Sequence, residues 1–451
     1  METPNLDRLV YEGVSFTNCF VPAPSCAPAR ASLFTGYYPH NTKIFKNGDS
    51  WQRSWVSKLS DAGYHTANIG KMHTTPFDSN KTGFQERFVV ENKDRFLQGA
   101  EFLDEWDKAL MANGLDKPGR IKYRTRKDYH DSLGAFLWDL PEHLHSDMFV
   151  GDMAIRWINR HPTNKPFFLQ IGFPGPHPPY DPIPRWADRY KDVDLNIAEV
   201  SDQDLESQPP PFNFMRTHNV EVDHDSIVHQ LHPSDSQRQK QREYYLANVS
   251  MIDEKMGQIM EALEQGGHLN NSVVIFTSDH GDCLTDHGHS QKWTMYDTVT
   301  RVPVIAWSPT NRFLRGATID DLYSWIDLGP TILELAGIDS SEEFDAISAL
   351  PSMTGKQTQG RDYVFSEHIR EDMMGLDTDF MTMVRSQKWK LVHFAGESFG
   401  QLFDLEADHN ETSNLWNNPA YQDVKQSLLE TLREWLISSN ARANNWGSDW
   451  R

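Results

Sequence analysis

The feature that most constrains the fold of this chain is a long helical pattern that leads directly into a continuous apolar run. Between Leu246 and Leu263, apolar side chains recur at helical spacing, and the pattern ends at Gly266 and Gly267. Residues 272–278 follow, with the sequence Ser-Val-Val-Ile-Phe-Thr-Ser, which is typical of a parallel strand buried on both faces. Because a helix that crosses over to a buried parallel strand is the unit of α/β folds, the sequence predicts that class.

Other segments repeat this alternation of strand and helix. The predicted elements are strands at residues 64–70, 167–173 and 302–307, a short helix at residues 5–9 with Pro4 near its start, and a helix around residues 327–335. We therefore expect a large mixed, mostly parallel sheet flanked by helices. In such sheets, ligands bind beyond the carboxyl ends of the strands.

The pattern changes near Gly337, which indicates a second subdomain. A polar stretch is followed by short predicted strands at residues 363–367, 381–384, 389–394 and 401–405. One apolar stripe from Val424 to Leu436 then predicts a helix. We expect an α/β catalytic domain over residues 1–338 and a C-terminal α+β subdomain over residues 339–451, with a small antiparallel sheet and a closing helix.

The composition excludes two classes of partner. A net charge of -21 opposes binding to nucleic acid or to an anionic membrane surface, so neither is expected as a partner. Three cysteines are too few for a disulfide framework, which favours a reducing compartment. No apolar run is long enough to span a bilayer, and the N-terminus shows no signal peptide. As the chain stands we expect a cytoplasmic protein; the alternative, if the natural N-terminus is missing, is a secreted or periplasmic one.

The segment around Cys26 carries the first candidate functional group. It reads Ser-Cys-Ala-Pro-Ala-Arg from Ser25 to Arg30 and continues as Ala-Ser-Leu-Phe-Thr-Gly. A cysteine ahead of this helix-compatible stretch would lie at a helix N-terminus, where free backbone N–H groups and the positive end of the dipole favour an anion. The residues alone leave two interpretations open: a nucleophile beside an anion site, or a small buried hydrophobic side chain.

Cys-x-Pro-x-Arg followed by Leu-Phe-Thr-Gly resembles the signature of the type I sulfatases, which belong to the alkaline-phosphatase superfamily. The resemblance implies an alkaline-phosphatase-like fold. It also implies that Cys26 is oxidised to formylglycine, with a formylglycine-generating enzyme as a maturation partner, and that the hydrated aldehyde is the nucleophile. Arg30 would then offset the negative charge of a bound sulfate group.

Two further motifs match the family in the same order along the chain. Lys71 and His73 lie in Gly-Lys-Met-His, directly after a predicted strand, and His177 lies in a proline-rich loop after the next strand. Taken singly, each motif favours a structural role: a solvent-facing lysine with a capping histidine for the first, and a proline-rich turn for the second. The resemblance implies that Lys71 contacts a sulfate oxygen, that His73 orients the formylglycine hydrate and removes a proton from it, and that His177 contacts the substrate.

The strongest cluster of polar residues follows the best predicted strand. A carboxylate and an imidazole at Asp279 and His280 can supply two ligands to one divalent cation, and Gly281 allows close backbone approach; a turn that ends the strand is the alternative. The resemblance implies a cation, Ca²⁺ first with Mg²⁺ or Mn²⁺ as alternatives, bound by Asp279, His280 and the modified Cys26, and an active-site lysine at Lys292. Neighbouring residues that we expect to be structural are Asp282, Asp286, His287 and Arg301.

One departure from the family concerns the metal site. In the family, a first strand and an acidic pair precede the Thr-Pro-Asn-Leu-Asp segment, and that pair binds the metal. This sequence begins at Met1 and reaches Thr3 without either feature. Since calcium and magnesium favour several oxygen ligands, we expect weakened metal binding and an exposed position in the central sheet, unless the natural start lies upstream.

Together the motifs predict hydrolysis of a small-molecule or carbohydrate sulfate ester to an alcohol and sulfate. His177 or Lys292 would protonate the leaving oxygen. Two alternatives stay open: a phosphonate or phosphate monoester hydrolase on the same scaffold, and a non-catalytic, sulfatase-like anion-binding protein. Expected insertions near residues 81–146 and 181–236 carry no motif that identifies the leaving alcohol or the oligomeric state. The candidate catalytic residues are Cys26, Arg30, Lys71, His73, His177 and Lys292.

Overall fold

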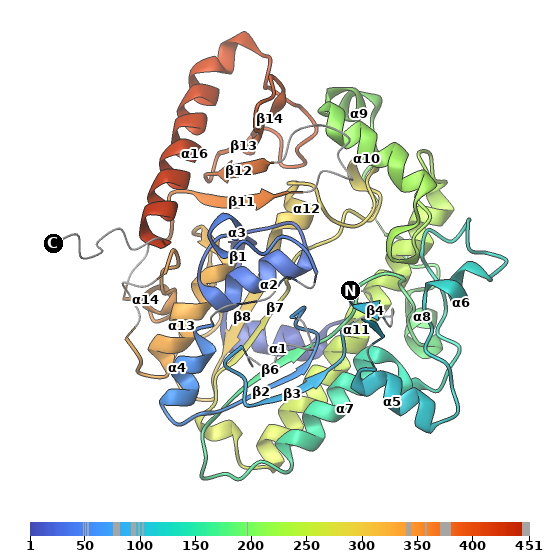
Figure 1. Ribbon diagram of the computed structural model, residues 1–451, viewed down its shortest axis with the longest axis vertical. Coiled ribbons are helices and arrows are strands. Elements are labelled where there is room, and N and C mark those ends of the chain that lie inside the picture. Colours follow the sequence, from blue (N-terminus) through green and yellow to red (C-terminus); the bar gives the residue numbers. More distant parts are fainter. Residues whose placement is uncertain are drawn as a thin grey trace.

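The computed structural model describes the chain apart from residues 48, 50, 52–53, 75–81, 92–95, 98–99, 102, 196, 340–343, 357–358, 370–379 and 444–451. Helices and strands alternate through a large α/β body, and the C-terminal sheet and its long helix, coloured orange to red, lie together at one end of it (Figure 1).

The larger sheet is built around the first strand. β1 (Val14–Phe20) pairs antiparallel with β8 (Arg301–Trp307) and parallel with β9 (Ala317–Ile319) and β10 (Tyr323–Ser324). On the other side of β8 lies β7 (Val274–Thr277), also antiparallel to it. The prediction of a parallel strand at residues 272–278 is therefore wrong for the pairing that the described residues make, because the chain turns back through the loop before β8.

A second sheet holds three further strands of the α/β body. β3 (Glu86–Val89), β2 (His65–Gly70) and β6 (Phe167–Gly172) are all parallel, and Gly70 lies opposite Gly172 at the shared carboxyl end. The α/β class with a mixed sheet is confirmed, but the main described strands of the α/β body form two sheets rather than one, and β4 (Phe96–Leu97) and β5 (Ala100–Glu101) pair separately from both. β6 and β7 are edge strands of their sheets. Their side chains are mostly half-buried, unlike those of a central strand.

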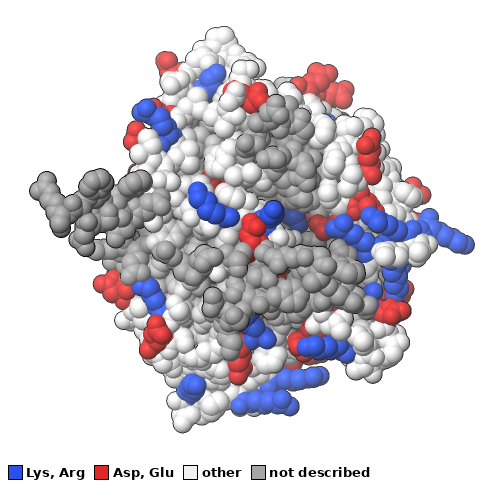
Figure 2. Space-filling view, in the orientation of Figure 1, with Lys and Arg blue, Asp and Glu red and all other residues white. Residues whose placement is uncertain are grey.

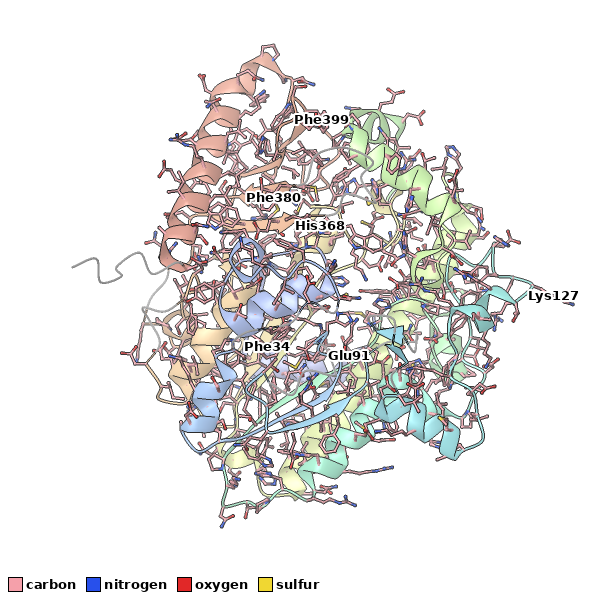
Figure 3. All side chains as sticks on the ribbon, viewed as in Figure 1. Phe34, Glu91, Lys127, His368, Phe380 and Phe399 are labelled. Carbon is pink, nitrogen blue, oxygen red and sulfur yellow. The ribbon has the colours of Figure 1, made fainter. Side chains whose placement is uncertain are left out.

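Helices cover both faces of these sheets. The reason is that β8 buries apolar side chains on both of its faces. Val302 and Val304 point into one core, whereas Ile305 and Trp307 point into the other. Phe34, labelled in Figure 3, stacks in the first core with Trp55. The first core is lined by α2 (Cys26–Thr35), α4 (Val56–Asp61) and α13 (Leu328–Leu335), and the second by α1 (Pro4–Glu12), α7 (Ser146–Ile158) and α11 (Asp235–Gln265).

The C-terminal sheet is a simple antiparallel meander. Its strands follow in chain order: β11 (Val364–His368), β12 (Met381–Arg385), β13 (Trp389–Phe394) and β14 (Gly400–Asp404). α16 (Gln422–Ala443) packs Leu428, Leu432 and Trp435 against it, as the apolar stripe predicts. The small antiparallel sheet and its closing helix are confirmed, while the domain boundary at residues 338–339 stays a prediction.

The stretches expected to be insertions contain mainly short helices. The remaining elements of the fold are α3 (Pro39–Thr42), β4 (Phe96–Leu97), β5 (Ala100–Glu101), α5 (Glu105–Ala112), α6 (Arg120–Arg124), η1 (Glu142–Leu144), α8 (Pro184–Tyr190), α9 (Asp202–Ser207), α10 (Pro210–Glu221), η2 (His224–Ser226), η3 (Leu269–Asn271), η4 (Asp286–Gly288), α12 (Asp297–Thr300), η5 (Trp325–Asp327), α14 (Leu350–Met353) and η6 (Pro419–Tyr421).

On one face of the molecule, charges of both signs occur together (Figure 2). On the face in Figure 2, basic and acidic side chains lie interspersed around the central grey atoms. The basic stretch near α6 is matched by acids, since Arg124 pairs with Asp223 and Arg126 with Asp128. Among the described helices, none combines the length and the apolar composition that crossing a bilayer requires.

A buried ion pair joins the C-terminal sheet to the α/β body. Nζ of Lys390, fully buried on β13, lies 2.8 Å from Oδ1 of Asp297 and 2.6 Å from Oε1 of Glu411. Burial opposes ionisation of Asp297, but Lys390 and Arg385 outweigh it and lower the pKa of that carboxyl. The two carboxylates therefore depend on this ammonium.

Lys390→Met is expected to lower the free energy of unfolding by about 3–5 kcal/mol, because it strands two buried carboxylates without their main cation. Lys388→Met is the matched control. Lys388 lies two residues away and pairs with Glu406 at the surface, so its loss should change stability far less. Urea titration of both variants measures the difference; equal midpoints would contradict the role given to Lys390.

Candidate active site

Cys26 lies at the start of a helix, as the sequence predicts. It is the first residue of α2, after an extended Ser25, and its side chain is buried. The helix ends at Gly36, whose φ of 78° is left-handed. The free N–H groups and the positive dipole end of α2 therefore lie beside the sulfur of Cys26.

Three cationic or imidazole groups surround that sulfur. Nε2 of His280 lies 3.0 Å from Sγ, Nζ of Lys292 lies at 3.5 Å, and Nζ of Lys71 lies at 3.9 Å. Burial opposes ionisation of the thiol, but Lys292, Lys71 and His280 together outweigh it and hold the pKa of Cys26 well below its ordinary value. Groups that stabilise a thiolate here would equally stabilise the negative charge of a sulfate group.

The other two cysteines show the opposite behaviour. Cys19 and Cys283 are also buried and free, yet burial raises the pKa of both thiols. The low pKa therefore comes from the position of Cys26 and not from burial as such. This contrast favours the nucleophile-site interpretation of the Cys26 motif over a purely hydrophobic role.

Arg30 connects three parts of the site. One helical turn after Cys26, its Nε donates to Oδ2 of Asp279 at 2.7 Å, and its Nη1 donates to the carbonyl oxygen of Lys71 at 2.8 Å. Burial opposes ionisation of Asp279, but Arg30 leads the charges that hold the pKa of that carboxyl well below its usual range. The guanidinium thus fixes the ends of β2 and β7 relative to α2.

One group of possible metal ligands lies within the described residues. It comprises Cys26, Asp279 and His280, whose ligand atoms lie within 4.8 Å of one another. Nδ1 of His280 donates to the carbonyl of Gly281 at 2.7 Å, which directs Nε2 into the site. A Cβ on Gly281 would lie 1.9 Å from the carbonyl oxygen of Thr298, so this position has room only for glycine.

This donor set fits a divalent cation, though as a partial set. It offers one carboxylate, one imidazole and the group at position 26, and Arg30 already engages Oδ2 of Asp279. Ca²⁺ takes about six to eight ligands, mainly oxygens. The described residues that converge here therefore supply only part of a calcium shell.

His177 and Lys292 meet in the pocket that Asp279 also lines. Nδ1 of His177 donates to the carbonyl of Pro178 at 2.8 Å, and its Nε2 lies 3.3 Å from Nζ of Lys292. Burial, followed by the charges of Lys71 and Lys292, lowers the pKa of His177 to about 3, so the ring is neutral. Its Nε2 is then an acceptor, and the proton shared between the two residues belongs to Lys292.

Lys292 is held both by the charges around its side chain and by the unusual backbone conformation of its loop. Burial opposes the charge on Lys292, but a thiolate at Cys26 and the carboxylate of Asp225 outweigh it and raise the pKa of the ammonium. The N–H of Trp293 donates to the carbonyl of Pro24 at 3.1 Å, which ties this loop to the segment before α2. Non-glycine residues of the loop with left-handed φ are Leu284, Thr285, His287, Gln291 and Trp293.

His73 is the one predicted residue whose contacts lie elsewhere. Its backbone N–H donates to Oε2 of Glu91 at 2.8 Å, and Nδ1 is buried with no partner among the described residues. Glu91, labelled in Figure 3, also accepts the N–H of Met72 and so holds the backbone after Lys71. Among the contacts described, none joins His73 to Cys26.

Six of the predicted residues line a common pocket, and known proteins resemble this chain in sequence and in fold. The Sulfatase family model matches residues 1–338. An arylsulfatase of Clostridium perfringens is 30% identical over 97% of this chain and 89% of its own length. The chain belongs to the sulfatase family. Its activity class is the hydrolysis of sulfuric esters, as the sequence predicts. Residues of the pocket are Arg30, Lys71, His177, Asp279, His280 and Lys292.

Other sulfatase-family relatives and structures extend the comparison. The model of the N-sulphoglucosamine sulphohydrolase C-terminal region matches residues 285–437. An N-acetylglucosamine-6-O-sulfatase of Bacteroides thetaiotaomicron is 24% identical over 96% of this chain and 82% of its own length. A phosphonate monoester hydrolase from Silicibacter pomeroyi has the same fold, with a TM-score of 0.78 and 22% identity over 97% of this chain and 90% of that one.

The neighbours that we expected to be structural have structural partners in this sulfatase. Asp282 accepts the hydroxyl of Tyr180, Asp286 pairs with Arg242, and His287 bonds Asp204. Three other residues reach the site without any motif: Glu91, Asp225 and Tyr245. Only their place in or beside the two expected insertions could have suggested them.

Proposed function

We propose that this chain hydrolyses sulfate esters through a nucleophile at position 26, within the cation cluster of Lys71, Lys292 and His280. The distances from Sγ to these groups carry the proposal, since they form a binding site for a tetrahedral anion at a helix N-terminus. The substrate would place its sulfur beside this atom, with its oxygens toward the lysines.

Two groups would complete the site. Cys26 is proposed to mature to formylglycine, by a formylglycine-generating enzyme, and its hydrate would supply an attacking hydroxyl and a second hydroxyl for product release. Asp279, His280 and the group at position 26 are proposed to hold Ca²⁺, with Mg²⁺ and Mn²⁺ as alternatives, and the cation would lower the pKa of the hydroxyl.

The side chains of this chain then have distinct roles. Lys71 and Lys292 would bind the sulfate oxygens, while Arg30 keeps Asp279 ionised and in place. Lys292 would protonate the leaving oxygen, because the neutral His177 accepts a hydrogen bond from it. Nδ1 of His73, for which the described residues offer no hydrogen-bond partner, is proposed to accept the proton whose loss releases sulfate.

The substrate class is proposed to be a carbohydrate or small-molecule sulfate. The support is the N-acetylglucosamine-6-O-sulfatase among the relatives, together with the two insertions that add polar groups around the pocket. The phosphonate monoester hydrolase of similar fold keeps a second candidate open, because the cation cluster would also bind a phosphonate.

Matched esters test the choice between these functions. On 4-nitrophenyl sulfate and 4-nitrophenyl phenylphosphonate we expect kcat/KM to be at least about 10²-fold higher for the sulfate, a difference of about 2.7 kcal/mol in transition-state binding. Mass analysis of the peptide that contains Cys26 accompanies the assay and reports the fraction of formylglycine. A matured enzyme that prefers the phosphonate would establish the alternative, and one inactive on both would favour the anion-binding protein.

A further inference from the structure

A carboxylate from outside every recognised motif reaches the catalytic lysine. Asp225 lies in η2, within the expected insertion at residues 181–236. Its Oδ2 is 3.7 Å from Nζ of Lys292 and 3.6 Å from Nε2 of His177. This is the only ion pair that Lys292 makes with a carboxylate among the described residues. Asp225 is therefore placed to act on the residue that would protonate the leaving group.

The same carboxylate is held from its other side. Nη2 of Arg120, at the start of α6, lies 3.2 Å from Oδ1 of Asp225. One oxygen thus meets Arg120 and the other meets Lys292. Burial opposes ionisation of Asp225, but the cations Lys292 and Arg120 outweigh it and lower the pKa of that carboxyl. Because Arg120 belongs to the first expected insertion and Asp225 to the second, the two insertions meet at the catalytic lysine.

The backbone of η2 is fixed in a conformation that few residues adopt. Asp225 and Ser226 have φ values of 55° and 65°, both left-handed and neither glycine. Such residues persist where the surroundings hold them, and they gather at functional sites. Two residues before Asp225, the carboxylate of Asp223 accepts hydrogen bonds from Arg124 and Tyr129 and so anchors the turn. Asp225 is therefore presented by a rigid turn.

Maturation of Cys26 makes this carboxylate more important. In the unmodified chain, a thiolate 3.5 Å away contributes to holding the ammonium of Lys292. The aldehyde hydrate that replaces it has hydroxyl groups in place of the sulfur, so the contribution of the thiolate is lost. Asp225 then supplies the fixed negative charge in contact with Lys292. The rigid turn sets the direction from which its carboxylate approaches the ammonium.

We propose that Asp225 is a positioning residue, which holds Lys292 against the leaving-group oxygen and is itself held by Arg120. The inference rests on the proposed role of Lys292 as proton donor. It predicts that Asp225 matters most for substrates whose alcohol is a poor leaving group. Such alcohols need the proton in the transition state, whereas an acidic phenol leaves without it.

The test is the leaving-group dependence of the matured enzyme. Rates on a series of substituted phenyl sulfates give the slope of log kcat against the pKa of the phenol. In Asp225→Asn we expect a steeper slope, with kcat on the least acidic phenol lower by about 10²-fold, little change on 4-nitrophenyl sulfate and a nearly unchanged KM. If this variant does not fold, Arg120→Gln, which releases the carboxylate, should steepen the slope to a smaller extent.

Asp223→Asn is the matched control, since it loosens the same turn without touching Lys292 or His177. It should lower the melting temperature while keeping the wild-type slope. An unchanged slope in Asp225→Asn, or equal steepening in Asp223→Asn, overturns the inference. Lys292→Gln separates the two proposals: if it too leaves the slope unchanged, the proton-donor role fails and the inference fails with it; if it alone steepens the slope, only the inference fails.

Discussion

Cys26→Ser is expected to reduce steady-state kcat on a sulfate ester by about 10⁴-fold or more, the scale seen when a nucleophile is removed. The hydroxyl can attack sulfur within the same cation cluster, because Lys71, Lys292 and His280 stay in place. It then forms a simple sulfate ester that lacks the second hydroxyl through which sulfate is expelled. At most one turnover per molecule should be observed, with the sulfate retained on the protein.

Rapid-quench kinetics and mass analysis of the peptide around position 26 measure this result. Cys283→Ser is the control, because Cys283 is buried beside Thr294 and its thiol pKa is raised rather than lowered. That variant should keep its kcat, and both variants should unfold at temperatures close to that of the wild type. Sustained turnover by Cys26→Ser would refute the formylglycine mechanism for this chain.

The sequence predicted most elements of the α/β body because their patterns are local. The helical pattern ending at Gly266 lies within α11, and the apolar run at residues 272–278 contains β7. β1 escaped prediction although it lies inside the larger sheet. Its sequence, Val-Ser-Phe-Thr-Asn-Cys-Phe, mixes apolar and polar side chains, so it lacks the continuous run that marks the other buried strands.

The sequence predicts where the strands lie better than it predicts which strands pair and in which direction. A single run of apolar residues does not state the direction of its neighbour, and β7 proves to pair antiparallel with β8. The separation into two sheets, with β6 and β7 at their ends, is likewise a property of long-range pairing. The cellular location and the domain boundary stay predictions.

The site divides in the same way into local and long-range parts. Cys26 and Arg30 share one helix, and Asp279 and His280 follow one strand, so motifs identify them. Asp225 is different, because its distance from Lys292 depends on how two insertions pack. Its sequence surroundings carry no signal for that packing. Positioning residues of this kind need a structure to be found.

Asp279→Asn is expected to have the second largest effect, on both activity and stability. The variant loses a proposed metal ligand and the partner of Arg30, whose side chain is only 10% exposed. A buried guanidinium without its carboxylate should lower the free energy of unfolding by about 3–5 kcal/mol. We also expect kcat to fall by about 10³-fold, since the group that stabilises charge at sulfur is disturbed. Metal content, by elemental analysis, should fall in parallel.

The double variant Arg30→Gln with Asp279→Asn separates these two effects. Replacing the charged pair by two amides removes the unpaired buried charge, so most of the lost stability should return in urea unfolding. Activity and metal content should not return, because the carboxylate is still absent. If stability fails to recover, the ion pair is not the cause of the loss. If activity recovers with stability, Asp279 serves to hold Arg30 in place and does not bind the cation.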